Sequence, residues 1–396
     1  MADDTPIFPF DIPPSIDVVP EFERLRSEAP VTRVRLSTGG EAYLVARYDD
    51  VRRVYADPLF SRARLVEPDQ PVLLPGNKLP HVLLNTDAPE HTRLRKLVTR
   101  AFTARAVERM RPRVEEITED LIDGLLEVGP PADAVADFAL PLPAALIAEL
   151  MGIPRGDVTQ LQRWLEHILS VSAHTPEETQ TAVGELTGYL VQLIATKRDH
   201  PGEDLTSALI QVRDAGDQLS EPELIFMLHL LLAGGYETTA TLLPNALITL
   251  FRNRDQWDRL CDDPALVPLA IEELLRYVPI TRSGLERVAT EDVELSGVTV
   301  PAGTTVLPLV NAAHFDPALV PDPQRLDVTR PPSPHLGFGH GIHHCVGASL
   351  GRLELATALT ALVTRMPELH LAGPEADVAW KQGLITRGPL ELSVAW

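Results

Sequence analysis

The segment that decides the fold is FGHGIHHCVG, residues 338–347. It holds Cys345, one of only two cysteines in the chain, among glycines and ring-bearing side chains. Glycine adopts backbone conformations that other residues avoid, so this segment can fold tightly around the sulfur. The second cysteine, Cys261, lies far away in the sequence. The segment therefore predicts a lone thiol in a tight loop, with no nearby partner for a disulfide.

Three interpretations compete for these cysteines. A lone cysteine is most often a small core residue, and we expect this of Cys261, which ends a predicted helix. A second interpretation is a zinc site with His340, His343, His344 and Cys345 as its ligands. However, adjacent side chains in a tight loop cannot all turn toward one ion. A single axial bond to an iron that four other ligands already hold, as in haem, suits Cys345 better.

The segment resembles the haem-binding loop of the cytochrome P450 family, in which phenylalanine, alternating glycines, histidine or arginine, cysteine and glycine recur at this spacing. The resemblance implies a mainly α fold with small β-sheets, the cytochrome P450 fold, built around a long buried central helix. It implies haem b as the cofactor, with Cys345 as the axial thiolate ligand of the iron. It also implies that Phe338 and Gly347 border the haem. We expect one domain over residues 1–396, with an extended N-terminal segment at residues 1–20.

The predicted central helix runs from Glu221 to Phe251. Ser220 and Pro222 form a good helix start, and the following run is apolar nearly all round. Its middle reads AGGYETT, residues 233–239. Each interior glycine costs about 1 kcal/mol relative to alanine, and a buried glutamate is costly unless it has a partner or a use. A loosely packed helix with a paired glutamate is the structural explanation.

The functional explanation is that the missing side chains let a flat cofactor and a small ligand lie against the helix. The sequence GGYET, residues 234–238, resembles the oxygen-activating helix of the cytochrome P450 family. This resemblance implies that Gly234 lies against the haem and that Thr238 hydrogen-bonds dioxygen. It implies that Glu237 controls the delivery of protons.

Glu273 and Arg276 lie three residues apart on one face of a predicted helix. Taken alone, they form an ordinary surface ion pair worth about 0.2–0.5 kcal/mol. Their position between the central helix and the cysteine loop, with Arg325 further along, resembles the Glu-x-x-Arg motif of the family and its later arginine. The resemblance implies a buried network of Glu273, Arg276 and Arg325 that steadies the haem loop.

Other residues match the contacts that the family makes to the haem propionates. His91 and Arg95 lie one helical turn apart, so both can point the same way. Taken alone, such a pair is more often surface charge, and the match to the family's His-x-x-x-Arg segment reverses that interpretation. Buried carboxylates need cationic or hydrogen-bonding partners. The resemblance implies propionate contacts from His91, Arg95, Arg287 and His343.

The composition argues against several classes of partner. The net charge of −21 disfavours nucleic acid and anionic membranes, because both repel an acidic surface. Two cysteines do not form a disulfide framework. The first residues show no secretory signal, and no apolar stretch of about twenty residues predicts a membrane span. We therefore expect a cytoplasmic protein.

The chain shows no motif for binding a dinucleotide cofactor that would supply electrons. Gly337, Gly339 and Gly341 come nearest, but they lead into the cysteine loop and lack the strand–turn–helix context. Electrons must come from another protein. The resemblance implies a ferredoxin and a ferredoxin reductase, with NAD(P)H as the source.

The implied function is that of a monooxygenase, which inserts one oxygen atom of O2 into a C–H or C=C bond. By analogy with bacterial members we expect a mostly apolar natural-product intermediate as the substrate, under a lid formed by residues 66–84. Two alternatives stay open. One is an oxidative coupling or ring-closing enzyme of the same family that inserts no oxygen. The other is a non-catalytic haem protein that senses or carries a gas and has no need of Glu237 and Thr238.

Overall fold

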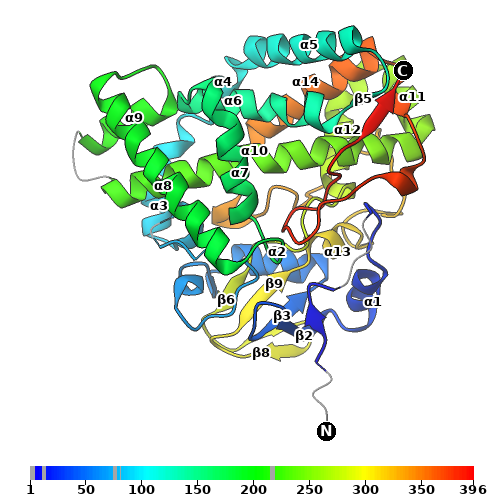
Figure 1. Ribbon diagram of the computed structural model, residues 1–396. Coiled ribbons are helices and arrows are strands. Elements are labelled where there is room, and N and C mark those ends of the chain that lie inside the picture. Colours follow the sequence, from blue (N-terminus) through cyan, green and yellow to red (C-terminus); the bar gives the residue numbers. More distant parts are fainter. Residues whose placement is uncertain (1–4, 11–14, 75–77, 81, 215–218) are drawn as a thin grey trace.

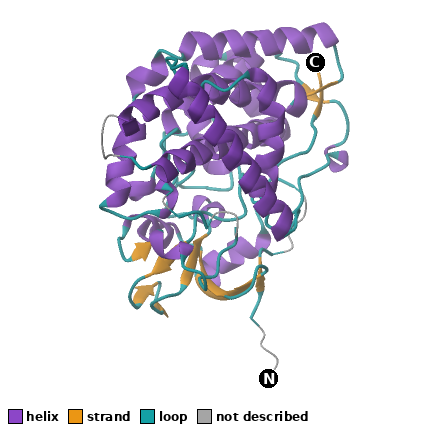
Figure 2. Cartoon of the chain, turned by 60° about the vertical axis from the view of Figure 1, so that its left-hand side comes forward, coloured by secondary structure: helices purple, strands orange, loops and turns teal. Residues whose placement is uncertain are grey.

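The computed structural model describes residues 5–10, 15–74, 78–80, 82–214 and 219–396. Most of the helices gather on one side of the molecule and the largest sheet lies on the other (Figure 1). Figure 2 shows the same separation of helices from strands after a turn of the view. The helices are α1 (Pro20–Glu28), α2 (Tyr48–Ala56), α3 (Glu90–Thr99), α4 (Ala104–Glu108), α5 (Arg111–Val128), α6 (Pro141–Met151), α7 (Val158–Ile168), α8 (Pro176–Asp199), α9 (Leu205–Asp214), α10 (Glu221–Arg252), α11 (Arg254–Asp262), α12 (Val267–Tyr277), α13 (Val310–His314) and α14 (Ala348–Arg365). Of these, α1, α2 and α13 lie beside the largest sheet (Figure 1).

The helix α10 is the expected long central helix. It begins with a capping box: the Ser220 hydroxyl accepts the N–H of Glu223, and the Glu223 carboxylate accepts the N–H of Ser220 at 2.7 Å. Every residue from Thr239 to Leu250 is buried. Helices α6, α8 and α14 pack against it. This burial on all sides follows from the all-round apolar sequence, and it confirms the mainly α fold class.

The largest sheet has the strand order β1-β2-β3-β9-β6-β4. Strands β2 and β3 are antiparallel, with Val31 opposite Val45, and β3 runs parallel to β9. A second sheet has the order β10-β11-β5, and β7 pairs with β8. The strands are β1 (Ile7–Phe8), β2 (Val31–Leu36), β3 (Glu41–Val45), β4 (Phe60–Ser61), β5 (Ala132–Asp133), β6 (Arg287–Ala289), β7 (Val293–Leu295), β8 (Val298–Val300), β9 (Thr305–Pro308), β10 (His370–Leu371) and β11 (Ser393–Ala395).

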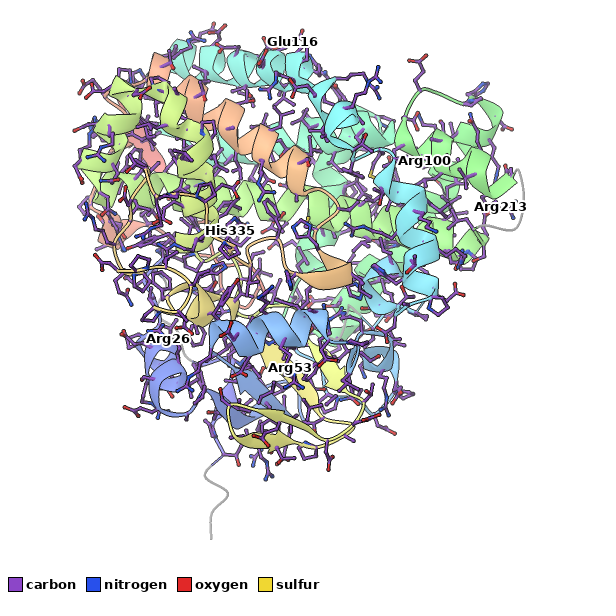
Figure 3. The ribbon with its side chains drawn as sticks, turned by 180° about the vertical axis from the view of Figure 1, so that it is seen from behind. Arg26, Arg53, Arg100, Glu116, Arg213 and His335 are labelled. Atoms are coloured by element: carbon purple, nitrogen blue, oxygen red, sulfur yellow. The ribbon has the colours of Figure 1, made fainter. Side chains whose placement is uncertain are left out.

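Apolar side chains form one large core among the helices and smaller clusters beside the main sheet. Charged side chains such as those of Glu116 and Arg213 project from the outer faces of α5 and α9 (Figure 3). Many are paired, as Arg113 is with Glu116 at 2.6 Å. Among the described residues, no helix combines the length and the apolar character needed to cross a membrane.

Two expectations fall partly on residues outside those described. Residues 1–4 and 11–14 belong to the N-terminal segment that was expected to be extended. In the described part of this segment, β1 pairs in parallel with β2, and α1 begins at Pro20. Residues 75–77 and 81 belong to the expected lid at residues 66–84 and also lie outside the described ranges.

Candidate functional site

The loop that carries Cys345 ends where α14 begins. The N–H of Cys345 donates to the carbonyl oxygen of Phe338 at 2.8 Å and closes the loop. Gly341 has φ of 71°, and a Cβ atom there would lie 2.5 Å from the carbonyl oxygen of Tyr55 in α2. Only glycine fits this conformation and this close approach. The glycine-rich sequence thus packs the loop against α2 and fixes the position of the sulfur.

The surroundings of the Cys345 thiol combine burial with positive charge. Burial raises the pKa of the thiol, whereas a hydrogen bond from the Gly347 backbone and the charges of Arg95 and Arg352 lower it. The side chain still has exposed surface, so a ligand can reach the sulfur. Nearby cations and N–H donors stabilise a thiolate. The position suits a thiolate bound to a metal better than an inert core thiol.

Buried nitrogen atoms without a hydrogen-bond partner gather beside this loop. Within the described part of the chain, His91 Nε2, Arg287 Nη2 and His343 Nε2 have no partner. The rings of His91 and His343 lie 4.3 Å apart. Arg287 donates through Nη1 only to backbone carbonyl oxygens, at 3.1 and 2.9 Å. An unpaired buried polar atom costs about 1–3 kcal/mol. Arg287 can only donate, and a neutral histidine ring can donate from Nε2, so an acceptor from outside the chain would satisfy the whole cluster.

The electrostatics of the cluster favour an anionic acceptor. Burial, together with the charge of Arg287, lowers the pKa of His343 to about 2. Burial and the neighbouring Arg62 lower the pKa of Arg287 to about 9. Burial also lowers the pKa of Arg95, for which the described residues supply no carboxylate partner. Two carboxylates, such as the propionates of haem b, would satisfy these donors and offset the buried charge. The donor set therefore fits the cofactor that the sequence predicts.

The middle of α10 presents an open face. Gly234 and Thr238 are exposed, although the helix around them is largely buried. A Cβ atom added to Gly234 would meet no atom within 4 Å. The Thr238 hydroxyl donates to the carbonyl oxygen of Gly234 at 2.9 Å, which fixes its orientation and leaves its oxygen free to accept. The surface at Gly234 therefore leaves room for a flat group, and the Thr238 hydroxyl lies at the edge of that surface.

The Glu237 carboxylate is buried and held by several groups at once. Its Oε1 atom accepts from Lys381 Nζ at 2.7 Å and from the Thr386 hydroxyl at 2.9 Å. The Thr241 hydroxyl adds a contact at 3.2 Å. Lys381 and Thr386 were not predicted, because they lie 144 and 149 residues away from Glu237 and no sequence signal links them.

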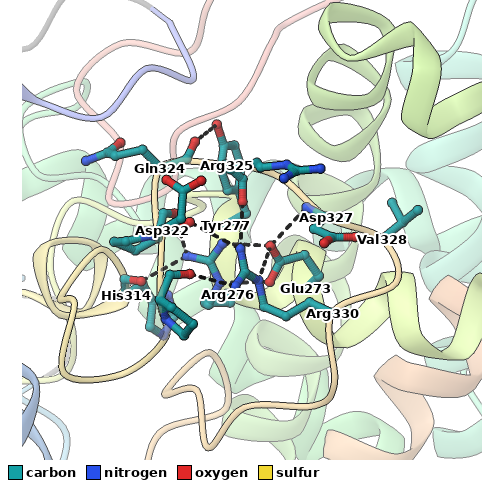
Figure 4. A network of polar contacts seen from close by, with 12 residues as sticks. Glu273, Arg276, Tyr277, His314, Asp322, Gln324, Arg325, Asp327, Val328 and Arg330 are labelled. Atoms are coloured by element: carbon teal, nitrogen blue, oxygen red, sulfur yellow. Dashed lines mark hydrogen bonds and ion pairs between the residues drawn. The ribbon is translucent and has the colours of Figure 1, made fainter.

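Glu273 and Arg276 form a fully buried pair, with both hydrogen bonds at 2.8 Å (Figure 4). Arg276 Nη1 also donates to the carbonyl oxygens of His314 and Pro323, each at 3.0 Å. The pair thereby joins α12 to α13 and to the segment that leads toward the cysteine loop.

The assignment of Arg325 to this network is wrong, because Arg330 supplies the third guanidinium. Arg330 Nε donates to Glu273 Oε1 at 3.1 Å, and Arg330 Nη2 donates to the backbone carbonyl of Arg325 at 3.0 Å. Two turns explain the exchange: the N–H of Arg325 bonds to Asp322, and the N–H of Arg330 bonds to Asp327. They fold Arg330 back onto Glu273, while the side chain of Arg325 points away (Figure 4).

A second polar cluster behind the cysteine loop was missed by sequence reasoning. Glu272 accepts from Arg352 Nε at 2.6 Å and contacts His335 Nε2 at 3.0 Å. The Arg352 guanidinium lies over the Phe338 ring, 4.6 Å from its centroid. This cluster ties α12 and α14 to both ends of the loop. The acid precedes Glu273 directly, but a single acid in a helix carries no signal of such a role.

The pKa of Glu272 predicts a stability effect at acid pH. Burial alone raises it, but the hydrogen bonds from His335 and Arg352 bring it down from 4.5 to about 2. A carboxyl with a lowered folded-state pKa stabilises the fold above its unfolded pKa, and this contribution is lost as the pH falls from about 4.5 to about 2.

We expect Glu272→Gln to lower the free energy of unfolding at pH 7 by about 1–2 kcal/mol, a value reduced for solvent screening. Urea unfolding at a series of pH values between 7 and 3 should show the gap between wild type and variant closing as the pH falls. A gap that stays constant across this range would contradict the assignment.

Comparisons with known proteins agree with this geometry. The family model described as Cytochrome P450 matches residues 263–367. Nocardicin C N-oxygenase of Nocardia uniformis subsp. tsuyamanensis is 44% identical over 99% of both chains. Mycinamicin IV hydroxylase/epoxidase of Micromonospora griseorubida is 44% identical over 98% of both chains. The crystal structure of cytochrome P450mel 107F1, described as having biaryl coupling reactivity, superimposes with a TM-score of 0.95 at 39% identity, covering 99% of this chain and 100% of that one.

Proposed function

Because the chain belongs to the cytochrome P450 family, it is a haem b monooxygenase, and we propose that its substrate is a mostly apolar intermediate of natural-product biosynthesis. Two relatives with the same 44% identity are named for oxidising nocardicin C and mycinamicin IV. Both names refer to the oxidation of natural products, and this supports a natural-product intermediate as the substrate. The substrate itself differs between these relatives, so only the class is carried over.

The observation that carries the cofactor assignment is the set of unpaired buried donors beside the cysteine loop. We assign to these donors and to Arg95 the binding of the propionates. When bound, haem supplies the activation of oxygen, which the electron-donating thiolate of Cys345 favours. Phe338, Gly347 and Gly234 border the cofactor in this assignment. The residues concerned with the propionates are His91, Arg95, Arg287 and His343.

Thr238 and Glu237 manage protons in the proposed mechanism. The exposed hydroxyl of Thr238, oriented by the Gly234 carbonyl, faces the open side of α10 and can hydrogen-bond a small ligand there. Glu237 lies one residue before Thr238 in α10, and its carboxylate is fixed within the buried face of the helix. Positioned proton transfer of this kind contributes about 10²–10⁴-fold to a rate.

The second candidate is oxidative coupling without oxygen insertion, because one structural relative is described as having biaryl coupling reactivity. The presence of both Glu237 and Thr238 favours oxygen insertion, since members of the family that use peroxide or couple phenols often depart from this pair. The third possibility is a non-catalytic gas sensor or carrier. Both relatives named above are enzymes that oxidise a substrate, so they do not support it.

Bacterial members of the family generally receive electrons from a ferredoxin and its reductase. We propose the same pair for this chain, with NAD(P)H as the source. Lys96, Arg100 and Arg105 are exposed and form no ion pair within the described residues. They lie on or beside α3 and α4, and α4 packs against α14, which follows the cysteine loop. These cations offer an acidic ferredoxin a docking surface on the thiolate side.

The test is reconstitution of the holoenzyme with a ferredoxin, a ferredoxin reductase and NADPH. Candidate compounds are first selected by the shift that they cause in the haem absorption band, and turnover is then run under ¹⁸O2. We expect a product that carries one labelled oxygen atom. A coupled product without labelled oxygen would show that the enzyme catalyses coupling and not oxygen insertion. If no bound compound were turned over, the proposal would be contradicted.

A further inference from the structure

The Glu237 carboxylate is anchored through one of its oxygens by a lysine from the end of the chain. Lys381 Nζ lies 2.7 Å from Glu237 Oε1, and only 13% and 11% of the two side chains are exposed. The Thr386 hydroxyl donates to the same atom at 2.9 Å. A buried carboxylate needs such partners, because its charge is otherwise uncompensated. With Oε1 held in this way, the side chain cannot rotate freely.

Lys381 and Thr386 belong to one hairpin, residues 380–389. Trp380 bridges to Pro389, and the N–H of Lys381 donates to the carbonyl oxygen of Gly388 at 2.9 Å. Thr386 bridges to Thr281, on the segment after α12. The backbone of the hairpin is therefore held on several sides, which fixes the point from which the Lys381 side chain reaches Glu237.

The tip of the same hairpin binds the connection between α7 and α8. The carbonyl oxygen of Gly383 accepts the N–H groups of Val171, Ser172 and Ala173 at 2.7, 2.9 and 3.2 Å. Gly383 has φ of 66°, and a Cβ atom there would lie 2.5 Å from the backbone nitrogen of Ala173. Only glycine permits this approach. One short hairpin thus contacts both the carboxylate of α10 and residues 171–173.

We propose that Lys381 is the positioning residue for Glu237, and that the hairpin makes the position of this carboxylate depend on the segment between α7 and α8. Lys381 does not itself exchange protons with the substrate. Its ammonium holds the Glu237 carboxylate in the place from which proton delivery beside Thr238 occurs. This inference rests on the proposed role of Glu237.

The experiment compares Lys381→Met with Glu237→Gln and with the double variant, all as holoenzymes. The measured quantities are product formed per O2 consumed, peroxide released, and the dissociation constant of the bound compound. We expect Lys381→Met to lower product per O2 about tenfold, the effect of losing one hydrogen bond to a charged group. The dissociation constant should change less than about threefold. Lys381→Arg, which keeps the cation, should recover most of the loss.

The matched control is Lys197→Met. Lys197 forms a similar ion pair with Asp204 at 2.6 Å, with 16% and 8% of the side chains exposed, between α8 and α9. It should couple oxygen to product as the wild type does. Thr386→Val removes a neutral donor from the same oxygen of Glu237, and it tests the positioning if Lys381→Met does not accumulate as holoenzyme. We expect a smaller loss from this variant, about threefold.

A second measurement, independent of turnover, reports on the tip of the hairpin at Gly383. Hydrogen–deuterium exchange of the amides at residues 171–173 should accelerate in Lys381→Met and stay unchanged in Lys197→Met.

The double variant separates this inference from the role of Glu237. If Lys381 acts through Glu237, the double variant should match Glu237→Gln alone. Wild-type coupling in Lys381→Met, with impaired coupling in Glu237→Gln, would overturn the inference and leave the role of Glu237 intact. Wild-type coupling in Glu237→Gln would overturn the proposed role of Glu237 itself.

Discussion

Cys345→Ser should abolish the absorption band that the reduced, carbon-monoxide-bound holoenzyme owes to thiolate ligation. A serine hydroxyl at this position is not an anionic sulfur donor, so the electron donation that favours O–O cleavage is lost. Turnover should fall by more than about 100-fold, because even loss of an outer partner of a metal ligand costs about 10–100-fold. The measurement is the difference spectrum with carbon monoxide, together with product formation in the reconstituted system.

The chain provides its own control in Cys261→Ser. Cys261 lies in α11, half-buried, and its sulfur makes only a weak contact with the carbonyl oxygen of Pro367 at 3.9 Å. This variant should keep both the band and the turnover. A band that persists in Cys345→Ser, or that disappears in Cys261→Ser, would show that the axial ligand has been assigned to the wrong residue.

Glu273→Gln should cause the largest loss of stability. The change leaves the guanidinium of Arg276, which is fully buried, without its carboxylate, and it replaces the charged acceptor of Arg330 with a neutral amide. Removing one partner of a buried ion pair costs about 3–5 kcal/mol. We expect this decrease in the free energy of unfolding in urea, and a lower haem content in the purified protein.

The matched control for this change is Glu108→Gln. Glu108 pairs with Arg111 at the same spacing of three residues and at 2.6 Å, but on the surface. Exposed pairs contribute little to stability, so this variant should unfold like the wild type. Equal destabilisation by the two substitutions would mean that burial of the network has no energetic importance.

The features that the sequence predicts well have local signals. The central helix was expected from Glu221 to Phe251 and runs from Glu221 to Arg252, because its cap and its apolar run lie within the segment itself. The loop around Cys345 is equally local: its glycines and the start of α14 are adjacent in the sequence. Features that depend on residues within one helical turn or one loop can be predicted from the local sequence alone.

The contacts that were missed or misplaced depend on how distant segments pack. Lys381 reaches Glu237 only because a hairpin near the end of the chain folds against α10. Arg330 replaces Arg325 in the buried network because two turns reverse the chain between them. Neither the direction of a long side chain after a turn nor the partner of a lysine 144 residues away is encoded in a short pattern.

The hairpin at residues 380–389 has a consequence for attempts to evolve this enzyme toward new compounds. Its tip binds residues 171–173, and its base holds the carboxylate of Glu237. If Lys381 positions Glu237 as proposed, random libraries that vary this hairpin to change substrate range would also contain variants that consume O2 without forming product. Libraries that keep Lys381, Gly383 and Thr386 fixed and vary only their neighbours would separate the two properties. Screening such libraries for product alone, without a count of oxygen consumed, would hide the difference.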